Sequence, residues 1–587
     1  MPFSSDPDLP SWRLPTLIAC VVALAFASGL GGAFVLDDES NITRNVKIHD
    51  LTRLDEIAFN PRRVVAYFSF AINWAISGDR PALYHVVNIL IHVAATLLLY
   101  DLTRAVLRSP CLASRKGDDA DFLAAAVALL WGVHPLQTQS VTYIVQRTES
   151  LMGLFFFATI WFAARGAWGA PSRARWSYAA AAIACWLGMF TKEVMIVAPL
   201  TLLLFDRVFL ATSWRELIAQ RWGLYLACFA AAACLVLNSG DTLDGRTVAM
   251  GYGNKYISTR EFAQTQPEVI LHYLKLAVWP RDLCLDYGWP VETDPTIIVA
   301  SSLAIGSLLV ATLLALRRDP PWGFVGAWFF LTLAPSSSVI PILDLAFEHR
   351  MYLPLVSVVI VVVLSTRWAL DAAMRAAPTL AFARPWIALL LLIGATTALA
   401  ARTWQRNFDY ASNETMWRDV IRQRPENARA HLSLAVQLDA TGRGEEALAE
   451  YREAEQLAKQ TRSPDLPLYR YSLALKLKNT GRSIEAIEAF TELIATAPDY
   501  GEPFAVRGRL LAQVNRRAEA IADLEEACRR VPADVRSRAT LADLLVSVGE
   551  YDQAVREAEA GLKADPRNGP LAIARARALL GLRDYAA

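Results

Sequence analysis

Long apolar runs separated by short polar stretches fill the first two thirds of the chain and end near residue 404. Most of these runs approach the ~20 residues that a helix needs to cross a bilayer. The pattern predicts an all-α fold that begins with a polytopic membrane domain of about eleven spans. We expect the spans at residues 14–34, 82–100, 121–135, 151–167, 177–191, 194–211, 222–238, 296–316, 321–335, 351–366 and 385–402.

The first run also raises the possibility of a signal peptide. It is longer than the apolar segment of such peptides, and Gly31-Gly32-Ala33 continues directly into acidic residues without a fitting cleavage site. We therefore interpret it as a membrane span.

The loops between the runs alternate in charge, which predicts how the chain crosses the membrane. One set is short and basic, and loops rich in arginine and lysine stay in the cytoplasm. Its basic residues are Arg104, Arg108, Arg115, Lys116, Arg165, Arg173, Arg175, Arg207, Arg215, Arg221, Arg317, Arg318, Arg367, Arg375 and Arg384. The N-terminus is then cytoplasmic, and an odd number of spans places the C-terminal part on the outer side.

The loops with unusual sequences all fall on the opposite, outer face. Loops that were only solvent-exposed connections would carry unusual sequences on both faces. Because all of these loops fall on one face, we expect one active site at the outer membrane surface. These loops are residues 35–81, 134–150 (HPLQTQSVTYIVQRTES), 191–193 (TKE), 239–295 and 335–354 (PSSSVIPILDLAFEHRMYLP).

Beyond residue 405 the sequence repeats with a period of 34 residues. Pro498, Pro532 and Pro566 are 34 residues apart, and so are Gly481, Asn515 and Gly549. An alanine follows each member of the second set five residues later, at Ala486, Ala520 and Ala554, and an earlier copy has Gly442 and Ala447. This is the tetratricopeptide pattern of paired helices, in which the small alanine lets the helices pack closely.

The chain therefore divides into a membrane domain, residues 1–404, and a tetratricopeptide-repeat solenoid, residues 405–587. We count four full repeats, with partial units at 411–425 and 570–587. Such a solenoid offers a concave surface for an extended peptide, and the alternative is a module for dimerisation or scaffolding alone.

Composition agrees with a membrane protein and excludes several other classes. Hydrophobic residues make up 54% of the chain, and the mean hydropathy is +0.28. The net charge of +1 points to no nucleic-acid partner. The seven cysteines are scattered without a CxxC pair, so we expect no disulfide framework and no zinc site.

Asp37 and Asp38, followed by Glu39, stand where the first span leaves the bilayer. A solvated stop signal is the simple interpretation, but acidic residues do little to set topology. A carboxylate tuned by its neighbour is suited to accept a proton from an attacking hydroxyl. A divalent cation at the pair is a further alternative.

Other charged residues accompany the acidic pair on the outer face. Arg147 and Glu149 follow HPLQTQ, and Lys192 and Glu193 stand alone between two apolar runs, where charges are costly and usually functional. The alternative is that the two pairs only neutralise each other.

Glu348, His349 and Arg350 precede the tenth span, and an arginine there can direct two donors at a phosphate. A snorkelling interface arginine is the alternative. His134 is either a helix-end cap or a participant. Acid and base groups on one face suggest group transfer from a lipid-phosphate donor.

The whole chain resembles the transmembrane and tetratricopeptide-repeat-containing family, which is similar to protein O-mannosyltransferases of the GT-C membrane glycosyltransferase class. The segments that carry the resemblance are FVLDDESNITRN, YHVVNILIHV, HPLQTQSVTYIVQRTESL, TKEVMIVAPLTLLLFD, YLKLAVWPRDLCLDYGWP and EHRMYLPLVS, followed by the repeats. The sequence departs from the family at NPRRVVAYFSF, where relatives read closer to YRPL, and at VQRTES, where they read GRADLL.

The resemblance implies an inverting transferase that moves a sugar, a hexose such as mannose, from a polyprenyl-phosphate donor to Ser/Thr hydroxyls of extracytoplasmic proteins. The family's catalytic acidic pair maps to Asp37 and Asp38, and its phosphate-binding arginine maps to Arg350. We expect Lys192 and Arg147 to assist at the phosphate, and the repeats to bind the protein acceptor. We expect a bacterial inner membrane with periplasmic repeats, or an endoplasmic-reticulum membrane in a eukaryote.

Two other functions stay open on the sequence alone. One is transfer to an envelope glycolipid or polysaccharide, and the other is a non-enzymatic membrane-anchored repeat scaffold. The supporting residues that we expect around the site are Glu39, His134, Glu149, Glu193, Glu348 and His349. The sequence identifies no cofactor and does not decide the metal requirement, and a divalent cation at Asp37 and Asp38 stays an alternative.

Overall fold

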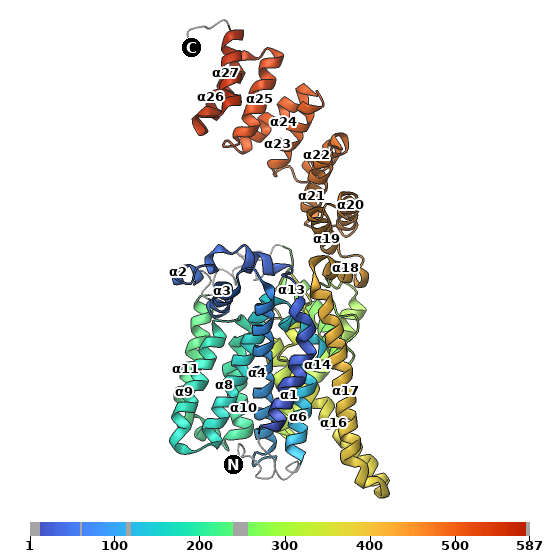
Figure 1. Ribbon diagram of the computed structural model, residues 1–587. Helices are drawn as coiled ribbons and strands as arrows, with labels where there is room; N and C mark the ends of the chain where they lie inside the picture. Colours follow the sequence, from blue (N-terminus) through green and yellow to red (C-terminus); the bar gives the residue numbers. More distant parts are fainter. Residues whose placement is uncertain (1–11, 59–61, 113–118, 239–255, 583–587) are drawn as a thin grey trace. The chain divides into compact units, whose positions relative to one another are not determined.

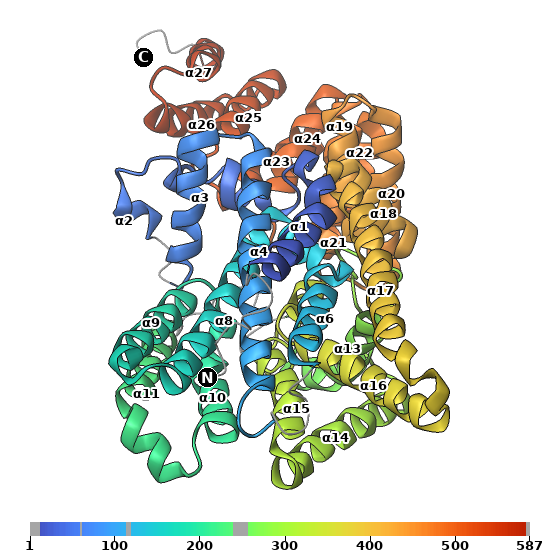
Figure 2. The same ribbon diagram turned by 60° about the horizontal axis from the view of Figure 1, so that its bottom comes forward.

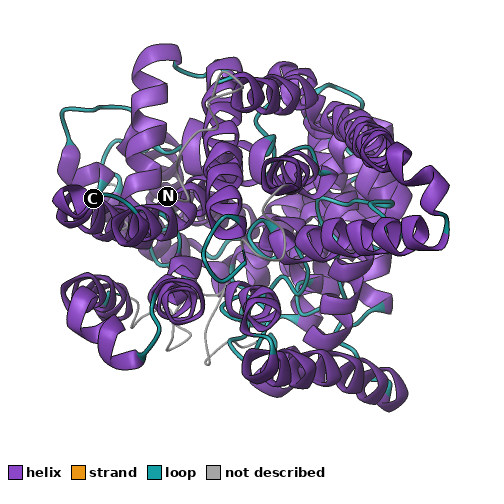
Figure 3. Ribbon diagram, turned by 90° about the horizontal axis from the view of Figure 1, so that it is seen from below, coloured by secondary structure: helices purple, strands orange, loops and turns teal. Residues whose placement is uncertain are grey.

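The computed structural model describes residues 12–58, 62–112, 119–238 and 256–582. These residues form helices joined by turns, and no β-strand occurs among them, as Figure 3 shows. The predicted all-α class is therefore confirmed. Part of the predicted outer loop (239–255), the basic residues Arg115 and Lys116 and the last five residues of the terminal repeat lie outside the described residues.

The chain divides into two compact units, Met1–Arg424 and Pro425–Ala587. The division falls further along the chain than residue 404, because α18 (Asn413–Gln423) belongs by its contacts to the first unit. The other longer helices of that unit are α1 (Arg13–Phe26), α3 (Val64–Ser77), α4 (Pro81–Leu107), α6 (Ala120–Gly132), α8 (Arg147–Trp168), α9 (Pro171–Met189), α10 (Ala198–Phe205), α11 (Trp214–Leu237), α13 (Thr259–Val278), α14 (Pro295–Arg318), α15 (Pro320–Leu333), α16 (Leu355–Ala376) and α17 (Arg384–Asn407).

Two groups of helices flank α1 and α4 in the first unit. Figures 1 and 2 show α8, α9, α10 and α11 on one side, and α14, α16 and α17 on the other. The short helix α2 (Leu54–Ile57) and the longer α3 lie at the same end of the bundle as the beginning of α4, at the top of Figure 1.

A buried aromatic cluster joins α4, α6 and the start of α16 at the centre of this bundle. His92 lies 2.9 Å from the Tyr352 hydroxyl and 2.8 Å from the Gly132 carbonyl, and the Trp131 indole donates to the Tyr352 carbonyl. A side chain at Gly132 would meet Thr96 and Val22 at under 3.0 Å, so glycine permits the close approach of α1, α4 and α6. His92, in the second apolar run, is therefore explained by its contacts with Tyr352 and Gly132 in the core of the bundle.

Each of the eleven predicted spans coincides with a helix, but the helices differ in length. Among the described residues, seven are long and apolar enough to cross a membrane, or up to eight with the pair Ala120–Gly132 and Pro135–Val141, which is bent by 52°. The remaining three predicted spans correspond to α9, α10 and α15. Because α10 and α15 have only 8 and 14 residues, the number of spans stays a prediction.

Unit 2 is built of consecutive antiparallel helix pairs and a last single helix: α19 (Ala428–Ala440) with α20 (Gly444–Gln460), α21 (Leu466–Asn479) with α22 (Ser483–Thr496), α23 (Glu502–Gln513) with α24 (Arg517–Arg530), α25 (Val535–Val548) with α26 (Tyr551–Ala564), and α27 (Gly569–Gly581). The periodic glycine-type positions lie in the turns within these pairs, and all have positive φ: Gly442, Gly481, Asn515 and Gly549. The periodic alanines are fully buried: Ala447, Ala486, Ala520 and Ala554. The repeat pattern therefore has the structural basis that the sequence suggested.

Candidate functional site

The stretch of residues 134–150, which we call the central loop, touches all four other predicted outer loops. The Val145 N–H donates to Asp38 at 2.6 Å, and Glu149 binds Lys192 at 2.6 Å. Gln139 donates to the Leu285 carbonyl and accepts the backbone N–H of His349. The structure therefore gathers these loops at one end of the bundle.

The two aspartates of the acidic pair have different environments. Asp38 is fully buried, and its two carboxylate oxygens accept the N–H groups of Val35 (2.9 Å) and Val145 (2.6 Å). Burial raises the pKa of Asp38 to about 8, and these two donors offset only part of the rise. Asp37 is exposed, and its backbone N–H donates to the Tyr143 hydroxyl at 3.0 Å. Asp38 thus fixes the loop, while Asp37 is exposed at its surface.

The backbone around Asp37 is unusual in two respects. Leu36 has a φ of 47°, a left-handed conformation that costs energy for a residue with a large side chain. The residues after the pair, Glu39–Thr43, form a short π-helix, a form that occurs frequently at functional sites. Glu39 itself pairs with Arg44 at 2.6 Å. This geometry presents Asp37 outward and turns Asp38 inward.

Two ion pairs lie beside the central loop. Lys192 is largely buried between Glu149 and the Gln146 amide oxygen, at 2.6 and 3.0 Å. Arg63 faces Glu193 with two longer contacts, 3.3 and 3.4 Å, and keeps 36% of its side chain exposed. Lys192 is therefore locked, whereas Arg63 is the more accessible and more loosely held cation.

Arg147 is fully buried and binds neutral groups. Its guanidinium donates to the Asn88 amide at 2.6 Å and to the backbone carbonyls of Ser69 and Tyr84. It also lies over the Phe70 ring, 4.7 Å from the centroid. Arg147 thus clamps α3 and α4 to the start of α8, and these neutral acceptors leave its positive charge uncompensated.

The segment Glu348-His349-Arg350 lies buried against the central loop. Arg350 donates to the carbonyls of Ser336 (3.1 Å) and Leu345 (3.0 Å) and to that of Asp344, so it also binds neutral groups. Burial lowers the pKa of His349 well below its ordinary value, and the charges of Lys192, Arg350 and Arg63 add to the effect. His349 is therefore a neutral imidazole among three cations.

Glu348 faces a different set of residues, on the side of the 284–287 turn. It accepts the Cys284 N–H at 2.6 Å and the Tyr287 hydroxyl at 2.7 Å. Burial raises the pKa of Glu348 to about 7, although Arg406 and these two donors lower it. Its role in the structure is to hold the turn against the buried Arg406 region.

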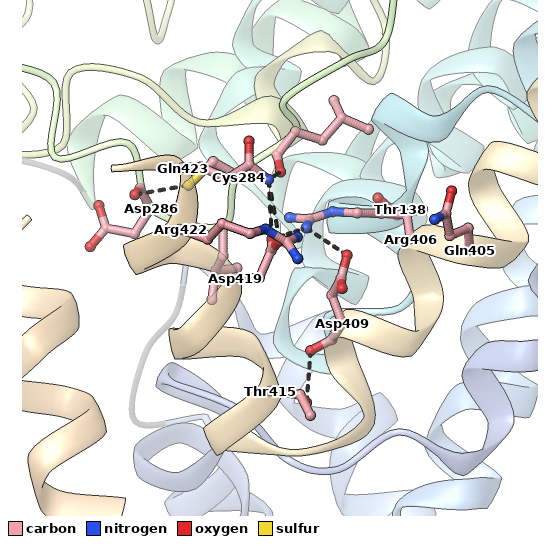
Figure 4. Close-up of polar contacts among 12 residues, drawn as sticks. Thr138, Cys284, Asp286, Gln405, Arg406, Asp409, Thr415, Asp419, Arg422 and Gln423 are labelled. Carbon is pink, nitrogen blue, oxygen red and sulfur yellow. Dashed lines mark hydrogen bonds and ion pairs between the residues drawn. The ribbon is translucent and has the colours of Figure 1, made fainter. Parts of the chain in front are cut away.

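Arg406, at the end of α17, is the centre of a buried polar cluster. Figure 4 shows its guanidinium beside Asp409 and Asp419, with which it forms ion pairs. Its Nε and one terminal nitrogen have no hydrogen-bond partner among the described residues. The same region supports the loop that carries Asp37 and Asp38, which we call the acidic loop. The Ala33 N–H donates to the Tyr410 carbonyl at 3.1 Å, and Asn413 donates to the Phe34 carbonyl. The cluster therefore ties α17 and α18 to the segment that carries Asp37.

His134 has both ring nitrogens engaged. Its Nδ1 accepts the Leu136 N–H, so Nε2 carries the proton and donates to the Ala277 carbonyl at 3.1 Å. This arrangement corresponds to the helix-end cap that the sequence left open.

Among the described residues, no three metal-ligating side chains lie together.

The sequence reasoning did not single out four residues that shape this site: Arg63, Gln139, Tyr143 and Arg406. Arg63 stands at the start of an apolar helix, and a charge in that position was the available signal. The other three are recognisable only from contacts with residues distant in the sequence.

No family model matches. The protein O-mannosyl-transferase Tmtc3 of Drosophila melanogaster is 24% identical over 82% of this chain and 58% of its own length. TMTC3 of Mus musculus and TMTC4 of Homo sapiens, also named protein O-mannosyl-transferases, are each 30% identical over 24% and 26% of this chain and over 16% and 23% of their own lengths. The chain thus covers less than two thirds of each of these relatives.

A solved structure described as YrrB, a TPR protein with an unusual peptide-binding site, matches 29% of this chain and 85% of its own at 19% identity. Its TM-score of 0.27 is too low to carry a structural argument. The curated relatives confirm the resemblance inferred from the motifs. The chain is similar to the transmembrane and tetratricopeptide-repeat-containing O-mannosyl-transferases, over most of its length to Tmtc3 of Drosophila melanogaster and over about a quarter of it to the mouse and human proteins.

Proposed function

We propose that the chain is a GT-C-type membrane glycosyltransferase that moves a hexose such as mannose from a polyprenyl-phosphate donor to Ser/Thr hydroxyls of extracytoplasmic proteins. The observation that carries this proposal is the exposed Asp37, held at the same end of the bundle as Arg63, Lys192 and Arg350. A base and a cluster of cations are the two requirements for displacing a lipid phosphate from a sugar.

The reaction is a single displacement. The acceptor oxygen attacks the anomeric carbon and forms the new C–O bond, while the bond between that carbon and the phosphate oxygen breaks. The hydroxyl proton goes to the Asp37 carboxylate, and the electron pair leaves with the lipid phosphate. One displacement inverts the anomeric configuration. Asp38 and Tyr143 position Asp37 and do not exchange the proton.

The cations stabilise the leaving phosphate in two ways. Arg63 is the side chain that approaches the phosphate, and the donor's charge replaces Glu193 as the partner of this loosely held arginine. Lys192 assists with its positive charge while it stays bound to Glu149. Arg350 and Arg147 contribute fixed positive charge from neutral surroundings. Preorganised groups of this kind contribute about 3 kcal/mol each to the transition state.

The repeats bind the protein acceptor, as the helix pairs of unit 2 would suit an extended peptide. In a bacterial inner membrane this assigns the repeats to the periplasm. The test uses the full chain in proteoliposomes with polyprenyl-phosphate mannose and a protein acceptor. We expect a hexose mass on Ser/Thr and a product of opposite anomeric configuration to the donor.

A matched preparation of Asp37→Asn is the control, and its transfer rate should be lower by about 10²- to 10⁴-fold. Label recovered only in lipid or polysaccharide would replace the proposal with transfer to an envelope glycan. No consumption of donor by the wild-type chain, with either acceptor class, would leave the scaffold interpretation in its place.

A further inference from the structure

A groove runs along one side of the first unit between α6, α16 and α17, which lie side by side in Figure 2. It consists of two cavities of about 720 and 380 Å³ that share the lining residues Leu130, Val362 and Ala395. We call the two together the α6–α16–α17 groove. Its walls are mainly apolar, whereas each of its ends carries two arginines.

The length of the groove along α17 is close to the thickness of the hydrocarbon core of a bilayer. One face of α17 lines it through residues spaced three or four apart: Arg384, Ala388, Leu392, Ala395, Leu399 and Arg402. At 1.5 Å per residue this face is about 27 Å long. The hydrocarbon core of a bilayer is about 30 Å thick. The two arginine-bearing ends therefore lie near the two membrane surfaces.

The two ends differ in charge balance. At the end farther from the acidic loop, Arg367 and Arg384 form ion pairs with Asp119 and Asp371 at 2.7–3.7 Å. That end is neutralised within the protein. A phosphate would have to compete there with carboxylates already in place.

The end nearer the acidic loop is not neutralised in this way. Arg402 donates to the Pro280 carbonyl (3.4 Å) and the Gln405 amide (3.2 Å), both neutral. Arg281 is exposed, and neither arginine forms an ion pair within the described ranges. One carboxylate, that of Asp282, also lines this end, so two arginines face a single acidic residue there. The adjacent Trp279 is 62% exposed, as is typical of aromatic residues at a membrane interface.

We propose that this end binds the phosphate headgroup of one anionic phospholipid of the outer leaflet, between Arg281 and Arg402. The acyl chains lie in the groove between α6, α16 and α17. Two arginines without carboxylate partners at the interface, above an apolar channel, match that amphipathic ligand in both charge and shape. The sugar donor is not the expected occupant, because none of Arg63, Lys192 and Arg350 lines the groove. The proposal does not depend on glycosyl transfer.

The test is native mass spectrometry of the full chain in mild detergent. Phosphatidylglycerol, phosphatidylcholine and polyprenyl phosphate are added separately at matched concentrations. We expect wild type to retain phosphatidylglycerol at least about tenfold more strongly than phosphatidylcholine. The double variant R281Q/R402Q should retain phosphatidylglycerol about tenfold more weakly than wild type does. The variant R317Q, which removes an exposed arginine outside the groove, should bind as wild type does.

A second variant addresses the channel itself. Ala398→Trp fills the groove without changing any charge, and it should displace the lipid while the protein stays monodisperse in gel filtration. Arg402→Lys should retain part of the binding. Equal phosphatidylglycerol retention in wild type, R281Q/R402Q and Ala398→Trp would overturn the proposal. Retention of polyprenyl phosphate alone would also overturn it, and would assign the groove to the donor.

Discussion

The unequal environments of Asp37 and Asp38 predict that the same substitution has different consequences at the two positions. Asp37→Asn removes the proton acceptor from an exposed side chain, so transfer should fall by about 10²- to 10⁴-fold. Its effect on the free energy of unfolding should stay within about 0.5 kcal/mol, as for other surface substitutions. The chemistry is lost and the fold is kept.

Asp38→Asn changes the fold of the loop instead. The ionised carboxylate, the form present above about pH 8, accepts both N–H groups. An amide has one acceptor oxygen, so relative to that form only one of the N–H groups of Val35 and Val145 keeps its partner, and the other meets the NH₂ group. A buried donor without a partner costs about 1–3 kcal/mol. Transfer then falls as well, because Asp37 is no longer held in position.

The pH dependence of stability gives an independent measurement at Asp38. Because its pKa in the folded protein is raised to about 8, the stability that it contributes is present at low pH and is lost as pH rises through about 8. The assay is thermal unfolding in detergent between pH 6 and pH 9, beside transfer rates, for wild type and both variants. Wild type and Asp37→Asn should lose stability over this range, and Asp38→Asn should lose less. A stable, fully active Asp37→Asn protein, or an Asp38→Asn protein as stable as wild type with an unchanged pH slope, would refute the assignment.

The remaining predictions concern the cations, the repeats and topology. Lys192→Met leaves Glu149 buried without its partner and should lower the free energy of unfolding by about 3–5 kcal/mol. The double variant with Glu149→Gln should regain most of that stability in thermal unfolding, whereas its KM for the donor should stay raised. Truncation after Arg424, which keeps α18, should reduce transfer to protein acceptors much more than transfer to short peptides at high concentration, and equal losses would assign the repeats to assembly. A reporter active only outside the cytoplasm should work when fused after Ala587, and activity of a cytoplasmic reporter there would contradict the predicted orientation.

The parts of this molecule with strong sequence periodicity were predictable. The apolar runs and the 34-residue repeat both reflect local rules, helix amphipathicity and a turn that needs positive φ, so the helices and the positions Gly481, Asn515 and Gly549 follow directly. Helix lengths were harder to predict. The predicted span 194–211 contains helix α10, which ends after eight residues where a π-helix begins at Asp206.

The site was predictable as a set of loops but not in its internal division of roles. The sequence of the acidic pair does not show that Asp37 is exposed and Asp38 is buried. That difference arises from the positive φ of Leu36 and from the hydrogen bond between Asp38 and the Val145 N–H, 107 residues away. The pair of Arg63 with Glu193 spans 130 residues for the same reason. Long-range contacts of this kind carry no local pattern.

The central loop has a mechanical consequence for the proposed enzyme. Val145 fixes the position of the base through Asp38, while Glu149, four residues later, holds Lys192 at the phosphate. Val145 lies in the short 3-10 helix that runs directly into α8, and Glu149 lies in the first turn of α8, so the two residues cannot move far apart. The two halves of the reaction centre therefore shift together, and a displacement of α8 would leave the distance between proton acceptor and leaving group almost unchanged while altering the access of both to the membrane surface.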